Sequence, residues 1–377
     1  MKVLQILPEL NSGGVERGTL EVADYLVKKG HKALVVSNGG RMVEALEKSG
    51  ARHILMPVHK KSPGSLLQVK PFRKLLEKER PDILHIRSRA PGWIAWLAWR
   101  GMNPDTRPRL VTTVHGFYSV NRYSAIMTKG ERVIAVSNSI REYILKNYPK
   151  VTAEKIRVIH RGVSPEQFPK DYRPTEEWLS AWRTSYPKLV GRKILLLPGR
   201  ITRWKGHEDF IRLISGLRSE GMGVHGLILG DTHSDKKTYE ARLKELTEML
   251  DIKSEITFLG YRKDVRDVMS ISDLIVSLSK SQEAFGRVVS EAAALGKPIL
   301  GYDHGGVSEQ LEELFPQGRV PVGDVSTAIE VARLILQNQQ IPIANNFYTL
   351  ERMLSATISV YSDLLQEFVS IKNDSQP

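Results

Sequence analysis

The stretch Leu274–Asp303, LIVSLSKSQEAFGRVVSEAAALGKPILGYD, has the pattern of a strand, a helix and a second strand. LIVSLS and PILGYD are short apolar runs, and the segment after Phe285 is helix-forming. Continuous apolar runs are typical of strands buried on both faces of a parallel sheet, and a helix is the usual connection between two such strands. The stretch therefore predicts a β–α–β unit in a parallel sheet.

The same alternation extends over both halves of the chain. The apolar runs are KVLQIL, HKALVVSN, RHILMPV, DILHIRS, RLVTTVHG, RVIAVSN and IRVIHRG in the first half, and KILLLP, VHGLILGD, EITFLGY, LIVSLS and PILGYD in the second. Two such series predict two doubly wound, Rossmann-like domains of the α/β class. Ligands of open α/β sheets bind outside the carboxyl ends of the strands, so we expect the domains to face each other across a cleft.

Composition changes between the two series. Residues 164–191 contain four prolines and one short amphipathic piece, which is typical of a segment between domains. We therefore expect an N-terminal domain at 1–170, a link at 171–191 and a C-terminal domain at 192–345. The last segment, 346–377, is expected to form a helix that packs back on the N-terminal domain.

The chain of 377 residues has a globular composition, with 41% hydrophobic and 26% charged residues. It has no cysteine, which excludes disulfides, thiolate metal sites and a cysteine nucleophile and suits a reducing compartment. The start, MKVLQILPELNSGG, lacks the apolar run of a signal peptide, and no stretch approaches the roughly 20 apolar residues of a spanning helix. We expect a cytoplasmic protein that does not cross a membrane by itself.

Positive charge is concentrated in the first half. Residues 1–185 contain 32 Lys+Arg and 17 Asp+Glu, a balance of +15, whereas residues 186–377 contain 23 and 25, a balance of −2, which together give +13. A basic half favours an anionic partner: nucleic acid, an anionic membrane surface or a phosphorylated substrate. The alternative is a solvated basic surface that keeps the protein soluble.

Three strand ends carry residues suited to anion binding or proton transfer. NSGGVERG follows the first strand, and Gly13 and Gly14 allow a ligand to approach the backbone at a helix N-terminus. Arg200 and Lys205, in GRITRWKGHED, follow the strand KILLLP and can bind an anion. His115 follows RLVTTV and can donate or accept a hydrogen bond near neutral pH. The structural alternatives are a tight turn, surface cations and a hydrogen-bonded structural histidine.

Other site classes lack their sequence patterns. NSGGVERG does not fit G-x-G-x-x-G, and neither G-x-x-x-x-G-K-[ST] nor H-E-x-x-H occurs in the chain, so a dinucleotide oxidoreductase, a P-loop NTPase and a histidine metal site are not supported.

The stretch quoted first also places two carboxylates eight positions apart. Glu283 precedes the predicted helix and can accept hydrogen bonds from sugar hydroxyls, and the helix start near Phe285–Arg287 offers free backbone amides. Glu291 lies about two turns along, and a carboxylate that accepts two vicinal hydroxyls is a common way to hold a ribose. The alternative is a pair of solvent-facing glutamates on an amphipathic helix. A strand–Gly-Gly–helix corner at Gly305–Gly306 follows shortly after.

Together these motifs resemble those of the retaining glycosyltransferases of family 4, which have the two-Rossmann GT-B architecture. The acid–seven–acid motif of the family corresponds here to Glu283-Ala-Phe-Gly-Arg-Val-Val-Ser-Glu291, and its phosphate-binding cations correspond to Arg200 and Lys205. The glycine loop of the family corresponds to GGVER, from Gly13 to Arg17, and its HG at a strand end corresponds to His115-Gly116. VSNSIREYI and HRGV are similar to family segments as well, and the resemblance extends from about residue 1 to about residue 323.

The resemblance implies a nucleotide-sugar donor, which is a substrate, and neither a cofactor nor a metal ion. The implied contact of the ribose is Glu291, and that of the base is the backbone of Arg262. The donor sugar would contact the segment Glu283, Ala284, Phe285, Gly286 and Arg287, and the diphosphate would contact Arg200, Lys205, Gly13 and Gly14. His115 would contact the donor sugar or the reacting centre. Many members carry an aliphatic residue after Phe-Gly, whereas this chain has Arg287, which leaves the identity of the donor sugar open.

The resemblance further implies that the N-terminal domain is on the acceptor side and that the C-terminal domain binds the nucleotide sugar. It also implies a retaining, metal-independent transfer in which Arg200 and Lys205 stabilise the leaving diphosphate. HIRSRAPGW and the segment 115–140 are most similar to bacterial transferases that build lipopolysaccharide or related surface glycans. We therefore expect a UDP-sugar donor, a lipid-linked or lipopolysaccharide-type acceptor, and a peripheral position on the anionic inner face of the cytoplasmic membrane.

Two other functions fit part of the sequence. A sugar-nucleotide epimerase would share the fold and the diphosphate site but would use no acceptor. A basic nucleic-acid-binding protein would fit the charge, but no recognised nucleic-acid motif or basic-aromatic interleaving is present, so nucleic acid is not an expected partner.

In APGWIAWLAWRG a helix is expected to begin at Gly92, after Pro91. Trp93, Trp96 and Trp99 recur every three residues and would cover one face of this helix, roughly 120° wide. This face either packs against the sheet or, because tryptophan favours membrane interfaces, rests on anionic lipid. The sequence leaves both alternatives open.

Overall fold

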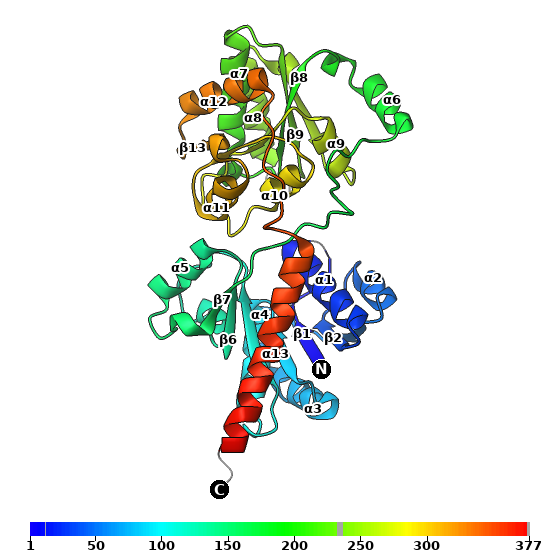
Figure 1. Ribbon diagram of the computed structural model, residues 1–377, viewed down its shortest axis with the longest axis vertical. Coiled ribbons are helices and arrows are strands. Elements are labelled where there is room, and N and C mark those ends of the chain that lie inside the picture. The colour runs from blue at the N-terminus through cyan, green and yellow to red at the C-terminus, as the bar shows by residue number, and fades with distance from the viewer. Residues whose placement is uncertain (12, 232–236, 375–377) are drawn as a thin grey trace. The chain divides into compact units, whose positions relative to one another are not determined.

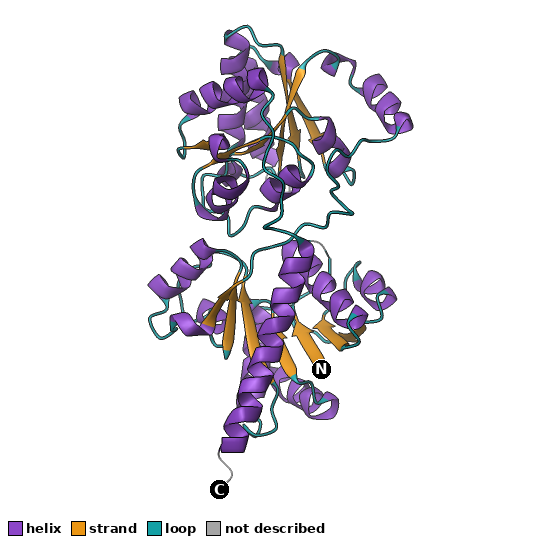
Figure 2. Cartoon of the chain, in the orientation of Figure 1, coloured by secondary structure: helices purple, strands orange, loops and turns teal. Residues whose placement is uncertain are grey.

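The computed structural model describes residues 1–11, 13–231 and 237–374, and the chain divides into two compact units (Figure 1). Unit 1 comprises Met1–His160 together with Glu351–Pro377, and unit 2 comprises Arg161–Leu350. Each unit has its own parallel sheet covered by helices (Figure 2), which confirms the predicted α/β class with two Rossmann-like domains.

Unit 1 contains a parallel sheet with the strand order β3-β2-β1-β4-β5-β6-β7. Its strands are β1 (Lys2–Ile6), β2 (Lys32–Ser37), β3 (Arg52–Leu55), β4 (Ile83–Ile86), β5 (Arg109–Val114), β6 (Arg132–Ala135) and β7 (Ile156–Val158). Its helices are α1 (Gly14–Lys28), α2 (Val43–Lys48), α3 (Val69–Glu79), α4 (Arg89–Arg100), α5 (Asn138–Asn147) and the C-terminal α13 (Leu350–Asp374). The central strands β1 and β4 are buried along almost their whole length, as their continuous apolar runs predict.

Unit 2 contains a parallel sheet with the strand order β10-β9-β8-β11-β12-β13. Its strands are β8 (Lys193–Pro198), β9 (Val224–Leu229), β10 (Ile256–Gly260), β11 (Leu274–Ser277), β12 (Ile299–Tyr302) and the short β13 (Arg319–Val320), which the sequence did not predict. Its helices are α6 (Glu176–Ser185), α7 (His207–Ser219), α8 (Lys237–Met249), α9 (Val265–Ile271), α10 (Arg287–Ala294), α11 (Gly305–Leu314) and α12 (Val325–Asn338). The β–α–β unit predicted first is β11, α10 and β12, with Ile275 paired in parallel with Ile299.

Helix α13 is fixed to the sheet of unit 1. The hydroxyl of Tyr361 lies 2.6 Å from Nδ1 of His85 in β4, and Nε2 of the same histidine lies 2.7 Å from Oγ1 of Thr113 in β5. Figure 1 shows this helix running across the strands of unit 1. His85 is therefore a buried histidine with partners at both ring nitrogens and acts as a structural residue.

Two segments differ from their expected boundaries. Helix α4 begins at Arg89 rather than at Gly92, because Pro91 lies in the first turn, where its missing N–H costs no hydrogen bond. The segment 171–191, expected as a link, contains helix α6 and belongs to unit 2, where Trp178 Nε1 donates a hydrogen bond of 2.8 Å to Asp264.

The tryptophans of α4 take part in packing within unit 1. Nε1 of Trp93 donates to the carbonyl oxygen of Tyr123 at 3.0 Å, and Nε1 of Trp99 donates to that of Pro108 at 2.6 Å. Trp96 is half-buried, with its ring centroid 5.8 Å from that of Trp93. Of the two alternatives for this face, the structure supports packing.

The order of strands reverses once in each sheet. In unit 1 the reversal lies between β1 and β4, and in unit 2 it lies between β8 and β11. Loops after the two strands at such a reversal leave in opposite directions and form a crevice at the carboxyl ends, where open α/β sheets bind ligands. The residues that follow β1, β4, β8 and β11 are therefore the first candidates for a site.

Candidate active site

The residues after β8 supply two cations to the carboxyl edge of the unit 2 sheet. Arg200 follows Gly199, and its side chain is exposed and makes no hydrogen bond or ion pair with any residue that the structure describes. Lys205 ends a short 3-10 helix, Arg203–Lys205, and its Nζ lies 4.5 Å from the ring centroid of Trp204. Both cations thus lie at the strand end where the sequence predicts an anion site.

Lys205 forms an ion pair with Glu283, the first carboxylate of the predicted motif. The distance from Lys205 Nζ to Glu283 Oε1 is 2.7 Å, and the two side chains are only 15% and 16% exposed. The hydroxyl of Ser279 also donates to Glu283 Oε1. Because β8 and β11 are neighbours at the reversal, this pair joins the two loops that leave it.

Glycines allow these loops to pack closely. Gly206 has φ 75°, and a Cβ there would lie 1.9 Å from the carbonyl oxygen of Leu278, so only glycine fits against the end of β11. Gly306 donates its N–H to the carbonyl of Glu283 at 2.8 Å, and a Cβ on Gly306 would collide with the backbone of Phe285. The second Gly-Gly corner therefore holds the loop that carries Glu283.

Helix α10 begins beside this loop. Its N-cap is Gly286 with φ 83°, which provides no side-chain cap, and the N–H of Val289 donates to the carbonyl oxygen of Gly286 at 3.0 Å. Phe285 is buried, with its ring centroid 5.5 Å from that of Tyr348, and Gln310 Nε2 donates to the carbonyl of Gly286 at 3.2 Å. The packing of Phe285 and the hydrogen bond from Gln310 thus fix the segment from Ala284 to Arg287.

Glu291, the second carboxylate, already has a cationic partner. Nε of Arg287 lies 3.3 Å from Glu291 Oε1, and the side chains are 18% and 13% exposed. A carboxylate has about four acceptor positions, so the contact with Arg287 does not by itself occupy all of them. The arginine that departs from the family pattern is therefore a neighbour of the predicted ribose ligand.

The side chain of Arg262 has a structural role. Its Nε and Nη2 bind the two carboxylate oxygens of Asp264 at 2.9 and 2.6 Å, and its guanidinium lies 5.2 Å from the ring centroid of Trp182. The pKa of the Asp264 carboxyl is lowered mainly by this hydrogen bond to Arg262. The arginine side chain thus joins the loop after β10 to helix α6, and only its backbone remains for the predicted contact with a base.

The predicted glycine loop lies in unit 1, after β1. Gly13 has φ 143° and precedes α1, and a Cβ on Gly14 would meet open space. A Cβ on Gly13 would lie 2.5 Å from Glu16 Oε2, so this carboxylate lies over the start of the helix. Burial raises the pKa of Glu16 above its ordinary value.

His115 directly follows β5 in unit 1. It is half-buried, and its backbone N–H donates to the hydroxyl of Tyr118 at 3.2 Å. The hydroxyl of Tyr143 donates in turn to the carbonyl oxygen of Tyr118 at 2.5 Å. The histidine is therefore at a carboxyl strand end, as predicted, within a loop stabilised by tyrosines.

The predicted residues thus fall into two groups. Unit 2 contains the cations and the acid–seven–acid motif, and within it the structure brings Lys205 to Glu283 and Arg287 to Glu291. Unit 1 contains Gly13, Gly14 and His115.

Sequence reasoning missed a supporting network under the unit 2 site. The carboxylate of Asp209 in α7 is buried, accepts from the hydroxyl of Tyr302 at 2.6 Å and pairs with Lys280 Nζ at 2.9 Å. The backbone N–H of Lys280 donates to the carbonyl of Trp204 at 2.6 Å, which ties the loop after β11 to the loop after β8. The sequence indicated this network only through Asp209, a charged residue in the first turn of α7, and such residues are also common on exposed helices.

Two further properties bear on the chemistry. Within the described ranges no group of three or more His, Cys, Asp or Glu side chains is arranged to hold a metal ion. In the same part of the chain, no helix is both long and apolar enough to cross a bilayer.

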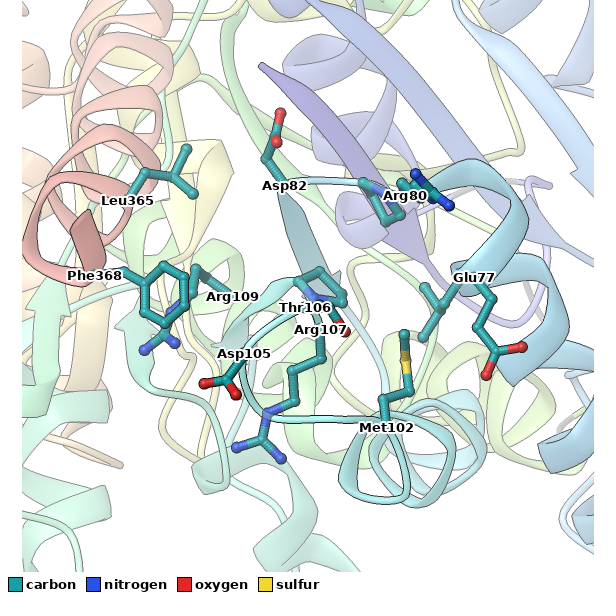
Figure 3. A pocket seen from close by; sticks show the side chains of 13 residues that line it. Glu77, Arg80, Asp82, Met102, Asp105, Thr106, Arg107, Arg109, Leu365 and Phe368 are labelled. Atoms are coloured by element: carbon teal, nitrogen blue, oxygen red, sulfur yellow. The ribbon is translucent and has the colours of Figure 1, made fainter. Parts of the chain in front are cut away.

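A cavity of about 600 Å³ in unit 1 lies elsewhere. It is lined by Arg80–Asp82, which precede β4, by Asp105–Arg109, which lead into β5, and by Leu365 and Phe368 of α13 (Figure 3). These residues mark the amino ends of the strands, at the opposite edge of the sheet from His115. The cavity is therefore not part of the predicted site.

Two family models match the chain in sequence. The model described as Glycosyltransferase Family 4 matches residues 12–167, and the model described as Glycosyl transferases group 1 matches residues 180–349. Spore coat protein SA of Bacillus subtilis is 26% identical over 251 residues, which cover 63% of this chain and 64% of that protein.

Solved structures share the fold. A glycosyltransferase from Rickettsia africae ESF-5 superimposes with a TM-score of 0.81 and is 32% identical over 97% of this chain and 98% of its own. The Anabaena protein Alr3699/HepE, solved in complex with UDP, has a TM-score of 0.76 over 99% of this chain and 100% of its own, with 18% identity. The matches over both halves and the Rickettsia relative lead to one conclusion: this chain belongs to glycosyltransferase family 4 and has its two-Rossmann GT-B architecture.

Proposed function

We propose that this glycosyltransferase moves a sugar from a UDP-sugar to a lipid-linked or lipopolysaccharide-type glycan acceptor, with retention of anomeric configuration and without a metal ion. The observation that carries the proposal is the Lys205–Glu283 pair at the reversal point of the unit 2 sheet, where a cation for a diphosphate meets a carboxylate for a sugar. The structural neighbour in complex with UDP supports uracil as the base.

The donor diphosphate binds Arg200 and Lys205 in this proposal. Arg200 is exposed and has no partner among the described residues, so it can bind two phosphate oxygens without breaking an existing contact. Lys205 is held in place by Glu283 and by the ring of Trp204. Cations fixed in advance stabilise the charge that develops on a leaving diphosphate, and this effect is worth about 2.7–4 kcal/mol for a single group in comparable sites.

The sugar nucleotide is held at its other end by the acid–seven–acid motif. The carboxylate of Glu291 accepts hydrogen bonds from the two ribose hydroxyls, and Arg287 orients this carboxylate. Glu283 and backbone amides at the start of α10 bind hydroxyls of the donor sugar. The amides at Gly13 and Gly14 add donors for the diphosphate, and the backbone at Arg262 contacts the base.

His115 lies at the reacting centre in this proposal and contacts the donor sugar. No second carboxylate is assigned as a nucleophile, so the transfer does not proceed by a double displacement on the enzyme. The leaving diphosphate oxygen accepts the proton of the acceptor hydroxyl as the new glycosidic bond forms on the face from which the diphosphate departs. Arg200 and Lys205 stabilise the negative charge of the leaving diphosphate, as a metal ion does in metal-dependent transferases.

Unit 1 carries a surface suited to the inner face of the cytoplasmic membrane. Leu66 and Leu67, in the 3-10 helix Pro63–Gln68, are 48% and 78% exposed. They are surrounded in sequence by exposed lysines that form no ion pair within the described residues, Lys60, Lys61, Lys70 and Lys74. Each such cation contributes about 1 kcal/mol near an anionic leaflet. We call this the lysine–leucine surface. It is the proposed membrane contact, because the tryptophans of α4 pack within unit 1.

The donor assignment is tested by the thermal shift of the full chain in excess EDTA. UDP, GDP and ADP, each free and as its glucose, galactose and N-acetylglucosamine derivatives, form the panel. The proposal predicts that UDP and one UDP-sugar raise the unfolding temperature, because a ligand that binds only the folded state stabilises it. Stabilisation by GDP or ADP compounds alone, or stabilisation by UDP that requires Mg²⁺ or Mn²⁺, contradicts it.

A further inference from the structure

The carboxyl edge of the unit 1 sheet carries an arginine stacked on aromatic rings. Arg89 is the first residue of α4, and its guanidinium carbon lies 4.4 Å from the ring centroid of Tyr118 and 5.6 Å from that of Tyr123. Its Nη1 donates to the hydroxyl of Ser124 at 3.1 Å. The guanidinium is thus fixed in position by a neutral hydroxyl and by ring faces.

The charge of Arg89 is not neutralised. It forms no ion pair with any carboxylate of the described residues, and its side chain is half-buried rather than enclosed. Stacking on a ring leaves the N–H groups at the guanidinium edge free to bind a planar or tetrahedral oxyanion in a forked geometry. Because the side chain is already ordered, binding costs little further conformational entropy.

The position of Arg89 connects it with the predicted reacting centre. Tyr118, on which it stacks, accepts the backbone N–H of His115 through its hydroxyl. Arg89 also follows β4, which borders the reversal of strand order in unit 1. Tyr118 thus contacts both Arg89 and His115, so a group bound by this arginine lies close to His115, at the edge of the sheet where ligands bind.

A second arginine and the start of helix α4 lie beside Arg89. Arg87, two residues earlier, is 2% exposed; the charge of Glu21 acts on it, and its Nε and Nη2 have no hydrogen-bond partner among the residues that the structure describes. The N-cap of α4, Ser88, makes no side-chain hydrogen bond to the helix start, so the first amides and the positive end of the helix dipole add to the field of the two arginines. Between Ile83 and Val114 the sequence has one acid, Asp105, and it lies in the loop before β5, at the other edge of the sheet.

We propose that Arg89, stacked on Tyr118, binds a phosphoryl group carried by a sugar of the glycosyl acceptor. This inference rests on the proposed function, because it takes unit 1 as the acceptor side of the reaction. It specifies the acceptor as a phosphorylated sugar and Arg89 as the residue that selects it. A neutral acceptor of the same shape lacks the charge that the guanidinium binds.

The test is residue-specific protection from phenylglyoxal, a reagent that modifies accessible arginines. The full chain is saturated with UDP, treated with the reagent in the presence of glucose 6-phosphate or glucose, and analysed by peptide mass spectrometry. The proposal predicts that glucose 6-phosphate at about ten times its Kd slows modification of Arg89 about tenfold, since the free site falls to about a tenth. Glucose at the same concentration leaves the rate unchanged.

The chain supplies a matched internal control. Arg100, at the other end of α4, is also stacked on a ring, with its guanidinium carbon 5.3 Å from the centroid of Trp96, and its modification should not respond to either sugar. Tyr118→Leu, which removes the stacking surface, should abolish the protection of Arg89, whereas Tyr118→Phe, which keeps the ring, should retain it. Equal protection by glucose, equal effects at Arg100, or no protection of Arg89 overturns the proposal.

The same experiment separates this inference from the proposed function. UDP alone should slow modification of Arg200, which lies in unit 2. Protection of Arg200 by UDP without protection of Arg89 by glucose 6-phosphate refutes only the acceptor inference. Absence of protection at Arg200 refutes the donor site and, with it, the proposed function.

Discussion

Lys205 Nζ lies 2.7 Å from Glu283 Oε1 at the carboxyl ends of β8 and β11, and the same two strands carry a second pair at their amino ends, Lys193 and Asp273, at 3.1 Å. The chemistry of the two pairs is the same, but their surroundings differ. The first pair is 15% and 16% exposed and belongs to the edge where ligands bind, whereas the second is 47% and 31% exposed at the opposite edge. The fold thus contains its own control for the role of a lysine–carboxylate pair.

Lys205→Ala should lower turnover by about two decades or more, because a fixed cation that stabilises developing charge on the diphosphate is worth about 2.7–4 kcal/mol. The KM for the donor should change less than kcat. Steady-state release of UDP from the donor measures both quantities.

Lys193→Ala is the matched control for this substitution. It removes a lysine at the other end of β8 and breaks an ion pair of the same type, so it should leave kcat within about twofold, as an exposed pair contributes only about 0–1 kcal/mol to stability. If both alanine variants lose activity to the same extent, the loss reflects the sheet and not the diphosphate site.

Glu291→Ala should weaken UDP binding about 5- to 150-fold, because unpaired ribose hydroxyls cost about 1–3 kcal/mol. Titration calorimetry with UDP measures this change directly. Glu312→Ala, at an exposed glutamate of α11, should bind UDP as the wild type does.

The ion pair with Arg287 requires a second variant. Removal of Glu291 leaves Arg287 half-buried without its partner, so binding could fall through a local rearrangement. In the double variant Arg287→Ala/Glu291→Ala the unpaired charge is gone, and UDP binding should remain weak. Recovery of wild-type affinity in the double variant would show that the carboxylate acts only on Arg287 and not on the ribose.

His225, buried in β9, makes the stability of unit 2 depend on pH. Burial lowers the pKa of His225 from its ordinary value of 6.5 to about 4, so this histidine is neutral in the folded state whereas the unfolded chain takes up a proton below pH 6.5. The contribution of His225 to the free energy of unfolding should therefore be constant well above pH 6.5 and decrease as the pH drops toward 4. About 2 kcal/mol should be lost at this one residue between pH 7.5 and 5.

The measurement is urea unfolding of the wild type and of His225→Gln at pH 7.5 and pH 5. Glutamine cannot be protonated and can still bond to the hydroxyl of Thr257, which lies 2.8 Å from His225 Nε2. The variant should lose less stability than the wild type on acidification. An identical loss in both proteins contradicts the assignment.

The lysine–leucine surface predicts salt-sensitive binding to anionic vesicles. The wild type should sediment with vesicles of phosphatidylglycerol and phosphatidylcholine at low salt, less at high salt, and not with phosphatidylcholine alone. Leu66→Gln/Leu67→Gln should reduce the bound fraction, whereas Ile341→Gln/Ile343→Gln, at exposed apolar residues of unit 2, should not. Equal loss in both double variants, or binding to neutral vesicles, contradicts the assignment of this surface.

Much of the fold was predictable because apolar runs and glycine corners report local structure. Leu274–Asp303 forms the β–α–β unit that its pattern predicts, and the cations and acids lie at the strand ends expected for them. The start of α4 was misplaced because Pro91 looks like a boundary, although the first turn of a helix tolerates it.

The contacts of the site could not be predicted, since they depend on which strands are neighbours. Lys205 and Glu283 are 78 residues apart in sequence and meet only because β8 and β11 are adjacent at the reversal. Likewise, whether the tryptophans of α4 faced lipid or protein depended on the carbonyls of Tyr123 and Pro108, which lie in other segments. Periodicity identifies a face of a helix but not its partner.

The central claim, transfer of a sugar from a UDP-sugar at the Lys205–Glu283 site, is tested most directly by NMR of the reaction in excess EDTA. The full chain is incubated with the UDP-sugar that stabilises it and with phosphorylated glycan acceptors, and UDP and the anomeric proton of the product are followed together. The account predicts release of UDP, a product with the anomeric configuration of the donor, and loss of both signals in Lys205→Ala but not in Lys193→Ala. A product of inverted configuration, a reaction that stops in EDTA, or an epimerised UDP-sugar without release of UDP would contradict it.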